Sequence, residues 1–152
     1  MRPLYETKEH LLQERNIASM IGHLWNCETR KLPITYHLDF ILSRNRKALG
    51  FMEIKSRSNR SSSEVDRMGG YLINLSKIEK AKSLTKITGL PFFLVVEFSD
   101  GIFAARFNEI PNFDIFIGGR KDRNDWQDIE PVVLINMNLF KQLDWNKKVA
   151  AA

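Results

Sequence analysis

The sequence has a single cysteine and no long apolar run. Cys27 alone excludes an internal disulfide and a zinc site built from several cysteines, and it fits a reducing compartment. No apolar stretch approaches the ~18–20 residues of a membrane-spanning helix, and residues 1–6 lack the hydrophobic stretch of a signal peptide. We therefore expect a cytoplasmic protein with no membrane segment.

The chain has 152 residues, of which 43% are hydrophobic and 27% charged. This composition is ordinary for a globular protein, so it indicates neither disorder nor a coiled coil. Single hydrophobic cores usually occupy roughly 100–200 residues, which leaves no room for a second independent domain. We expect one domain over residues 1–152.

The net charge of +5 is concentrated in the middle of the chain. Residues 1–43 carry five basic and five acidic side chains, residues 44–86 carry eleven and four, and residues 87–152 carry seven and nine. The excess of +7 in the central segment is typical of a surface that contacts a phosphate backbone. Nucleic acid is therefore the leading partner, although an unevenly charged solvated surface would give the same count.

Residues 5–26 predict an amphipathic helix, because Leu11, Ala18, Ile21 and Trp25 recur at steps of three and four. Glu14 falls on this apolar stripe. A carboxylate facing a core needs a partner or a metal ion; the alternative is that Glu14 lies at the edge of the stripe and reaches water.

A β-hairpin is predicted next. Apolar and polar residues alternate from Ile34 to Ser43, the polar residues 43–46 form a turn, and residues 48–56 return as a second strand. Glu53 and Lys55 are two residues apart and so share one face of that strand. If Asp39 pairs near the level of Glu53, two carboxylates and an ammonium converge, either as a functional site or as a cross-strand ion pair.

Residues 57–70 are polar and serine-rich and end in two glycines, which predicts a mobile loop. Ser76 followed by Glu79 matches the capping box that opens many helices, and Gly89 is typical of a helix end, so we expect a helix over residues 77–88. Its inward face is expected to be apolar and its outward face basic. The inward residues would be Ile78, Ala81, Leu84 and Ile87, and the outward ones Lys77, Lys80, Lys82 and Lys86.

The near-continuous apolar run of residues 92–98 predicts a strand buried on both faces at the centre of a sheet. Residues 99–101 form a turn and residues 102–107 a returning strand. We expect irregular structure over 108–131, a last strand over 132–135 and a closing helix over 137–145. The order of these elements indicates an α/β sandwich with a mixed sheet.

Acidic side chains on adjacent strands suit a hard divalent cation, usually Mg²⁺, which prefers oxygen ligands and binds phosphate oxygens through its remaining positions. Glu14, Asp39 and Glu53 could form such a cluster. Lys55 beside them could position an attacking water or offset charge on a phosphorane transition state.

The series Glu14, then Asp39 within residues 36–40, then Glu53 and Lys55 within residues 51–55 resembles the signature of the PD-(D/E)XK nuclease superfamily, and in particular its small phage-encoded members. Leu38 stands where the family name has proline, which removes no ligand. The resemblance implies a restriction-endonuclease-like α/β core of order αβββαβ, with a mixed central sheet flanked by helices. It also implies hydrolysis of DNA phosphodiester bonds with Mg²⁺, for which Mn²⁺ would substitute, and the cytoplasm of a host cell as location.

The resemblance also implies roles for individual residues. Asp39, Glu53 and the Ile54 carbonyl would bind the metal, Glu14 would bind it directly or through water, and Lys55 would act on the nucleophilic water. Basic and aromatic side chains near the site would contact DNA, and His37 would support Asp39 from the same strand face. The resemblance gives Lys77 and Tyr71 as DNA-contacting residues, and Arg57, Arg60 and Arg67 are added because their segment follows Lys55 directly.

Three functions remain open at this point: a metal-dependent DNA endonuclease, a non-catalytic DNA-binding module with a nuclease-like fold, and a structural protein whose charges merely pair. Within the enzyme class, an exonuclease and a Holliday-junction resolvase are alternatives. No zinc finger or recognition helix is present, so we expect structure-selective or weakly sequence-selective cleavage. One active site cuts one strand, so cutting both would need a homodimer or a second encounter. Phe113, Phe116 and Trp126 could form a dimer contact or stack on bases, but packing is the default.

Overall fold

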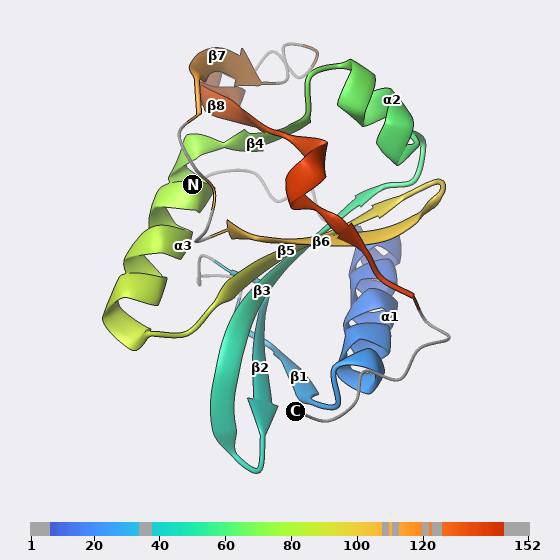
Figure 1. The fold of residues 1–152 in the computed structure, drawn as a ribbon, viewed down its shortest axis with the longest axis vertical. Coiled ribbons are helices and arrows are strands. Elements are labelled where there is room, and N and C mark those ends of the chain that lie inside the picture. The colour runs from blue at the N-terminus through green and yellow to red at the C-terminus, as the bar shows by residue number, and fades with distance from the viewer. Residues whose placement is uncertain are drawn as a thin grey trace.

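The computed structural model describes residues 7–33, 38–107, 110, 113–119, 122 and 126–144. A large sheet lies at the centre, with helices against it and a small sheet to one side (Figure 1). The elements in chain order are α1 (Lys8–Leu24), β1 (Glu28–Lys31), β2 (Phe40–Arg44), β3 (Lys47–Arg57), α2 (Ser62–Arg67), β4 (Tyr71–Asn74), α3 (Leu75–Thr88), β5 (Phe92–Phe98), β6 (Gly101–Arg106), β7 (Ile115–Gly119), the 3-10 helix η2 (Trp126–Asp128), β8 (Ile129–Ile135), the 3-10 helix η3 (Met137–Leu139) and β9 (Lys141–Gln142).

The large sheet has six strands in the order β1-β2-β3-β5-β6-β9. Only β3 and β5 pair in parallel, and the other neighbours are antiparallel. The predicted mixed central sheet is therefore confirmed. β5 lies inside the sheet, and Leu94, Val95 and Val96 are fully buried, as the apolar run predicted.

Two clusters of buried apolar side chains cover the two faces of the large sheet. On one face α1 packs Ile17, Ala18 and Ile21 against residues such as Met52 and Ile54 of β3. On the other face, α3, the small sheet and β5 share a second cluster. Along β3 the side chains alternate between these faces, so Glu53 and Lys55 project away from the α1 layer.

The predicted helix and hairpin are confirmed with small changes. Thr7 caps α1 by accepting a hydrogen bond from the His10 N–H at 3.2 Å. The hairpin turns at Asn45 and Arg46, which have φ values of 50° and 65°. Two successive positive φ values match the twist of the strands that a two-residue turn connects. Residues 34–37, where the predicted strand begins, lie outside the described residues.

The prediction of a loop over residues 57–70 is wrong, because part of that segment forms α2. Ser61 accepts a hydrogen bond from the Glu64 N–H, and the Glu64 carboxylate accepts one from the Ser61 N–H, which makes a complete capping box. The Ser62 N–H also donates to Asp100 at 2.8 Å. These contacts fix the segment that follows β3 instead of leaving it mobile.

The helix after it starts earlier than predicted. Asn74 is the N-cap of α3, so Ser76 lies within the first turn and the predicted capping box is wrong. Gly89 ends the helix with φ 72°, as predicted. Ile78 and Ala81 are buried, but Ile87 is 81% exposed, so the apolar face stops before the last turn.

β4 forms a second sheet with two strands from the C-terminal part of the chain, in the order β4-β8-β7. Its presence overturns the prediction of irregular structure over 108–131. The predicted closing helix over 137–145 is also wrong, since this segment contains η3 and then β9, which pairs with β6. Among the described residues, no helix is long and apolar enough to cross a membrane.

Candidate active site

Asp39 lies where β2 begins, next to the middle of β3. The strands pair from Phe40 with Met52 onward, so Asp39 precedes the first pair and faces the next part of β3. Its Oδ2 accepts a hydrogen bond from the Ile54 N–H at 2.9 Å. On its other side β3 continues to pair with β5 as far as Arg57. Asp39 therefore takes the place of a strand partner at this point of β3.

Glu53 is fully buried and contacts two ammonium groups. Its Oε1 lies 2.8 Å from Lys77 Nζ and 3.1 Å from Lys55 Nζ. Its Oε2 has no hydrogen-bond donor among the described residues. A buried charge without full compensation is costly, so this oxygen is a vacant acceptor of the kind that a cation or a water would satisfy. The ion pairs come from β3 itself and from α3, not from the neighbouring strand.

The acidic groups act on one another. Burial and then the negative charge of Glu53 raise the pKa of Asp39 from 3.8 to about 6, against the hydrogen bond from Ile54. Burial lowers the pKa of Lys55, but the charges of Glu53 and Asp39 raise it above its ordinary value overall. Lys55 therefore stays an ammonium at neutral pH, able to orient a water or stabilise negative charge but not to remove a proton.

Glu14 meets Asp39 through a lysine that the sequence pattern did not single out. Lys31 Nζ lies 2.5 Å from Glu14 Oε2 and 3.8 Å from Asp39 Oδ1. The Glu14 side chain is only 13% exposed, so it lies at the inner edge of the helix stripe. Lys31 pairs with Phe40 across β1 and β2, which places it beside Asp39.

The carboxylates differ from the predicted three-ligand cluster. No three His, Cys, Asp or Glu side chains of the described residues gather as metal ligands would. Asp39 and Glu53 nevertheless fit a hard cation, because burial and then the charge of Glu53 raise the pKa of Asp39, and Glu53 has a buried oxygen without a donor among the described residues. The Ile54 carbonyl points to the same strand edge as its N–H. Glu14 does not join them, because it forms an ion pair with Lys31.

The predicted DNA-contacting residues separate into three groups. Arg57 and Arg67 are exposed, and Arg60 is exposed with its guanidinium 3.5 Å from the Met68 sulfur. Lys77 is turned inward to Glu53, contrary to the predicted outward position.

Tyr71 is also placed differently, since it is 4% exposed and packs edge-to-face against Phe98 and Phe140. Its position indicates a packing role, and burial raises the pKa of its hydroxyl. His37 lies outside the described residues.

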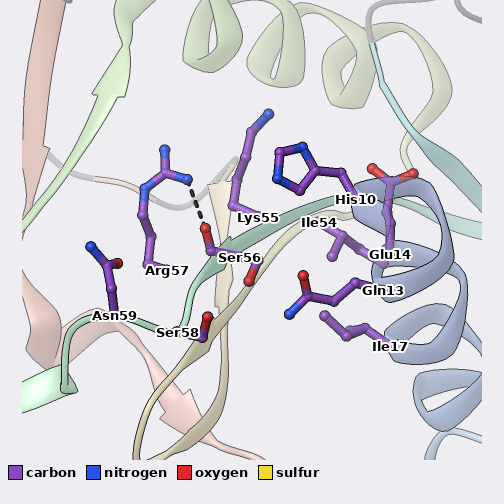
Figure 2. Close-up of a pocket in the computed structure, with 10 residues that line it drawn as sticks. All are labelled: His10, Gln13, Glu14, Ile17, Ile54, Lys55, Ser56, Arg57, Ser58 and Asn59. Atoms are coloured by element: carbon purple, nitrogen blue, oxygen red, sulfur yellow. Dashed lines mark hydrogen bonds between the residues drawn. The ribbon is translucent and has the colours of Figure 1, made fainter. Parts of the chain in front are cut away.

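A pocket of about 330 Å³ adjoins the site between α1 and the end of β3. Figure 2 shows the α1 side chains facing those of β3 and the following turn across it. Lys55, which contacts Glu53, and Glu14, which contacts Lys31, also line this pocket. The lining residues are His10, Gln13, Glu14, Ile17, Ile54, Lys55, Ser56, Arg57, Ser58 and Asn59.

Solved structures with a similar fold include two nucleases. The Holliday junction resolvase Hjc of the archaeal hyperthermophile Archaeoglobus fulgidus matches with a TM-score of 0.55 and 9% identity, covering 90% of this chain and 93% of that one. A nuclease from a fusellovirus matches with a TM-score of 0.50 and 17% identity, covering 93% and 91%. At these identities the likeness concerns the fold, and it confirms the predicted restriction-endonuclease-like architecture.

At the level of sequence, no curated protein matches this chain. A family model does, over residues 1–143, and its description is "phage putative PDDEXK endonuclease". That span contains Glu14, Asp39, Glu53 and Lys55. The chain therefore belongs to the phage PD-(D/E)XK endonuclease family and is a nuclease of that type.

Proposed function

We propose that the protein is a magnesium-dependent DNA endonuclease that selects its substrate by structure or by weak sequence preference. The supporting observation is the arrangement of Asp39 and Glu53. One accepts a hydrogen bond from the backbone of Ile54, and the other is buried beside it with an oxygen that has no donor among the described residues. Two such carboxylates beside an ammonium are the groups needed to hold a metal ion near a phosphate.

Mg²⁺ or Mn²⁺ would be held by Asp39, Glu53 and the Ile54 carbonyl, and it would supply a water of lowered pKa and a charge on the phosphate oxygens. Lys55 would orient that water and offset the negative charge that develops on the phosphate. Its elevated pKa supports this role, since an ammonium performs both tasks without losing its proton. Glu14 would bind the metal ion directly or through a water, in place of its contact with Lys31.

DNA is the proposed partner, bound by the exposed basic residues that follow β3. Arg57, Arg60 and Arg67 are exposed on this segment, which begins two residues after Lys55 and contains the capped helix α2. Arginines of this kind contribute affinity without reading sequence, and their contribution falls as salt rises. The fold neighbour that acts on Holliday junctions makes branched DNA a substrate to test. A homodimer remains our expectation if both strands are cut.

The test is cleavage of supercoiled plasmid, linear duplex, single strand and a four-way junction, with Mg²⁺, Mn²⁺ or EDTA. We expect metal-dependent cutting by the wild type, none by Glu53→Ala, and wild-type activity for Glu79→Ala, which removes an exposed carboxylate of α3. Salt-sensitive DNA binding without cutting in either metal would contradict the proposal and favour a non-catalytic binding module.

A further inference from the structure

The pocket beside Lys55 has an apolar floor and a polar wall. Ile17 and Ile54 are nearly fully buried at its base. Gln13 Nε2 donates to Glu97 Oε1 at 2.5 Å, and Ser56 Oγ donates to the same oxygen at 3.1 Å. The Gln13 amide is therefore held in one orientation, and its carbonyl oxygen has no donor among the described residues.

The pocket lining carries charges of both signs, with Glu14 on one side and Lys55 and Arg57 on the other. Glu14 lines the pocket and Glu97 lies behind Gln13 and Ser56, so an anion placed inside would meet two carboxylates. Arg57 is an exposed lining residue, and Lys55 connects the pocket to Glu53, which its ammonium contacts at 3.1 Å. A nucleotide whose base enters the pocket would thus leave its phosphate near the proposed catalytic groups.

A nucleobase fits this combination of surfaces. It has flat apolar faces for the isoleucines and a polar edge for an amide, and Gln can offer a base both a donor and an acceptor. The volume of about 330 Å³ is at the small end of ligand pockets, which suits one nucleotide unit but not stacked base pairs. A base inside a duplex has its faces covered by its neighbours, so only an unpaired or extruded base could reach the floor.

We propose that this pocket binds one unpaired nucleobase of the DNA substrate, with Gln13 as the specificity-determining residue. The proposal rests on the proposed nuclease function and gives it a substrate class: DNA with an unpaired nucleotide next to the cut phosphate. Extruding a base from perfect duplex costs a few kcal/mol, whereas a base that is already unpaired avoids most of this cost. The pocket thereby supplies the structural selectivity.

The experiment compares three DNAs by fluorescence anisotropy in EDTA, so that binding is measured without cleavage. They are a duplex, the same duplex with a single-nucleotide bulge, and the same bulge lacking its base. We expect the wild type to bind the bulge about tenfold more tightly than the abasic bulge, the size of effect that one or two buried hydrogen bonds give. 2-Aminopurine placed in the bulge should change its fluorescence on binding.

Gln13→Met keeps the side-chain length but removes the amide, and should reduce the tenfold preference to about one while leaving duplex affinity unchanged. Asn16→Ala removes an exposed amide from the same helix and should keep the preference. Equal wild-type binding of the two bulges, or an undiminished preference in Gln13→Met, would overturn the pocket assignment, and the first comparison holds even if that variant fails to fold. Failure of the nuclease proposal would appear separately, as absence of metal-dependent cleavage.

Discussion

Lys77 Nζ lies 2.8 Å from Glu53 Oε1, which ties the first turn of α3 to the centre of β3. Glu53 is fully buried, and its second ammonium neighbour, Lys55, comes from its own strand. Two cations on one buried carboxylate oxygen reduce the cost of its charge and leave the other oxygen available. Lys77 at the start of α3 therefore pairs with a buried carboxylate of the candidate site and does not belong to a solvated lysine face.

We predict that Lys77→Met destabilises the protein by about 1–2 kcal/mol in urea denaturation, and that adding Glu53→Gln recovers most of this loss. Breaking a buried ion pair typically costs about 3–5 kcal/mol. The loss is smaller here because Lys55 remains and Lys77 is 30% exposed. Lys86→Met, on an exposed position of the same helix, is the control and should have little effect. Additive effects of the two substitutions would show that the contact contributes nothing.

The elevated pKa of Asp39 predicts how the stability of the metal-free protein depends on pH. Its folded-state pKa of about 6 exceeds the ordinary 3.8, so the folded state binds this proton more tightly than the unfolded state. This group's contribution to stability therefore falls as pH rises from about 4 to about 6 and stays low above that. Asp39→Asn, which keeps an oxygen for the Ile54 N–H, should be more stable than wild type at pH 7.5 by on the order of 2 kcal/mol.

The same comparison at pH 4 should show little difference, because Asp39 is then mostly protonated. Urea denaturation in EDTA at several pH values measures both effects. Asp66→Asn removes an exposed carboxylate of α2 and serves as the control. A stability difference that does not change between pH 4 and 7.5 would mean that the carboxyl group titrates normally.

The position of Lys31 predicts that its ammonium competes with the proposed metal ion for the carboxylates of Glu14 and Asp39. Its ammonium lies 2.5 Å from Glu14 and 3.8 Å from Asp39, so a divalent cation must share or displace it. Lys31→Met should therefore tighten Mg²⁺ or Mn²⁺ binding in isothermal titration calorimetry by roughly three- to tenfold, the range expected for one partly exposed ion pair. Lys47→Met, at an exposed position on β3, should bind as the wild type does. Weaker binding by Lys31→Met would mean that the lysine supports the metal site.

The sequence predicted the secondary structure correctly where apolar residues recur at one regular spacing. The helix stripe around Ile17 to Ile21, the alternation in the hairpin and the apolar run of β5 each consist largely of residues that the fold buries, those of β5 on both faces of the sheet. The meeting of Asp39 with the Glu53 strand follows from the same alternation and from a two-residue turn. Fold and central acidic pair were therefore predictable.

Short segments in which apolar residues have no regular spacing could not be predicted from the sequence. The four residues of β1 are mostly exposed, so their pairing depends on backbone hydrogen bonds that no side-chain pattern reveals, and Lys31 was missed with them. The capping signal was present twice, at Ser61 with Glu64 and at Ser76 with Glu79, but only the first caps a helix. At the second, β4 continues directly into α3, so the cap position falls on Asn74. The two local signals are equal, so the way each segment connects to its neighbouring strand determines which of them caps a helix.

The glycine that follows α2 provides the last prediction. Gly70 has φ 128°, and a Cβ there would lie 2.3 Å from the Ile135 carbonyl oxygen of β8. Gly70→Ala must both adopt a strained backbone and push two main chains apart, so we expect a loss of about 3 kcal/mol or more in urea denaturation.

Gly89→Ala is the matched control, because Gly89 has φ 72° and nothing lies within 4 Å of the added Cβ. It should cost only about 1–2 kcal/mol, the penalty of a left-handed backbone alone. The difference between the two variants measures the close approach of the chain after α2 to β8. Equal losses of stability in the two variants would show that the backbone at Ile135 moves away from the added Cβ at no cost. The contact of Gly70 with β8 would then not hold the end of α2 in place.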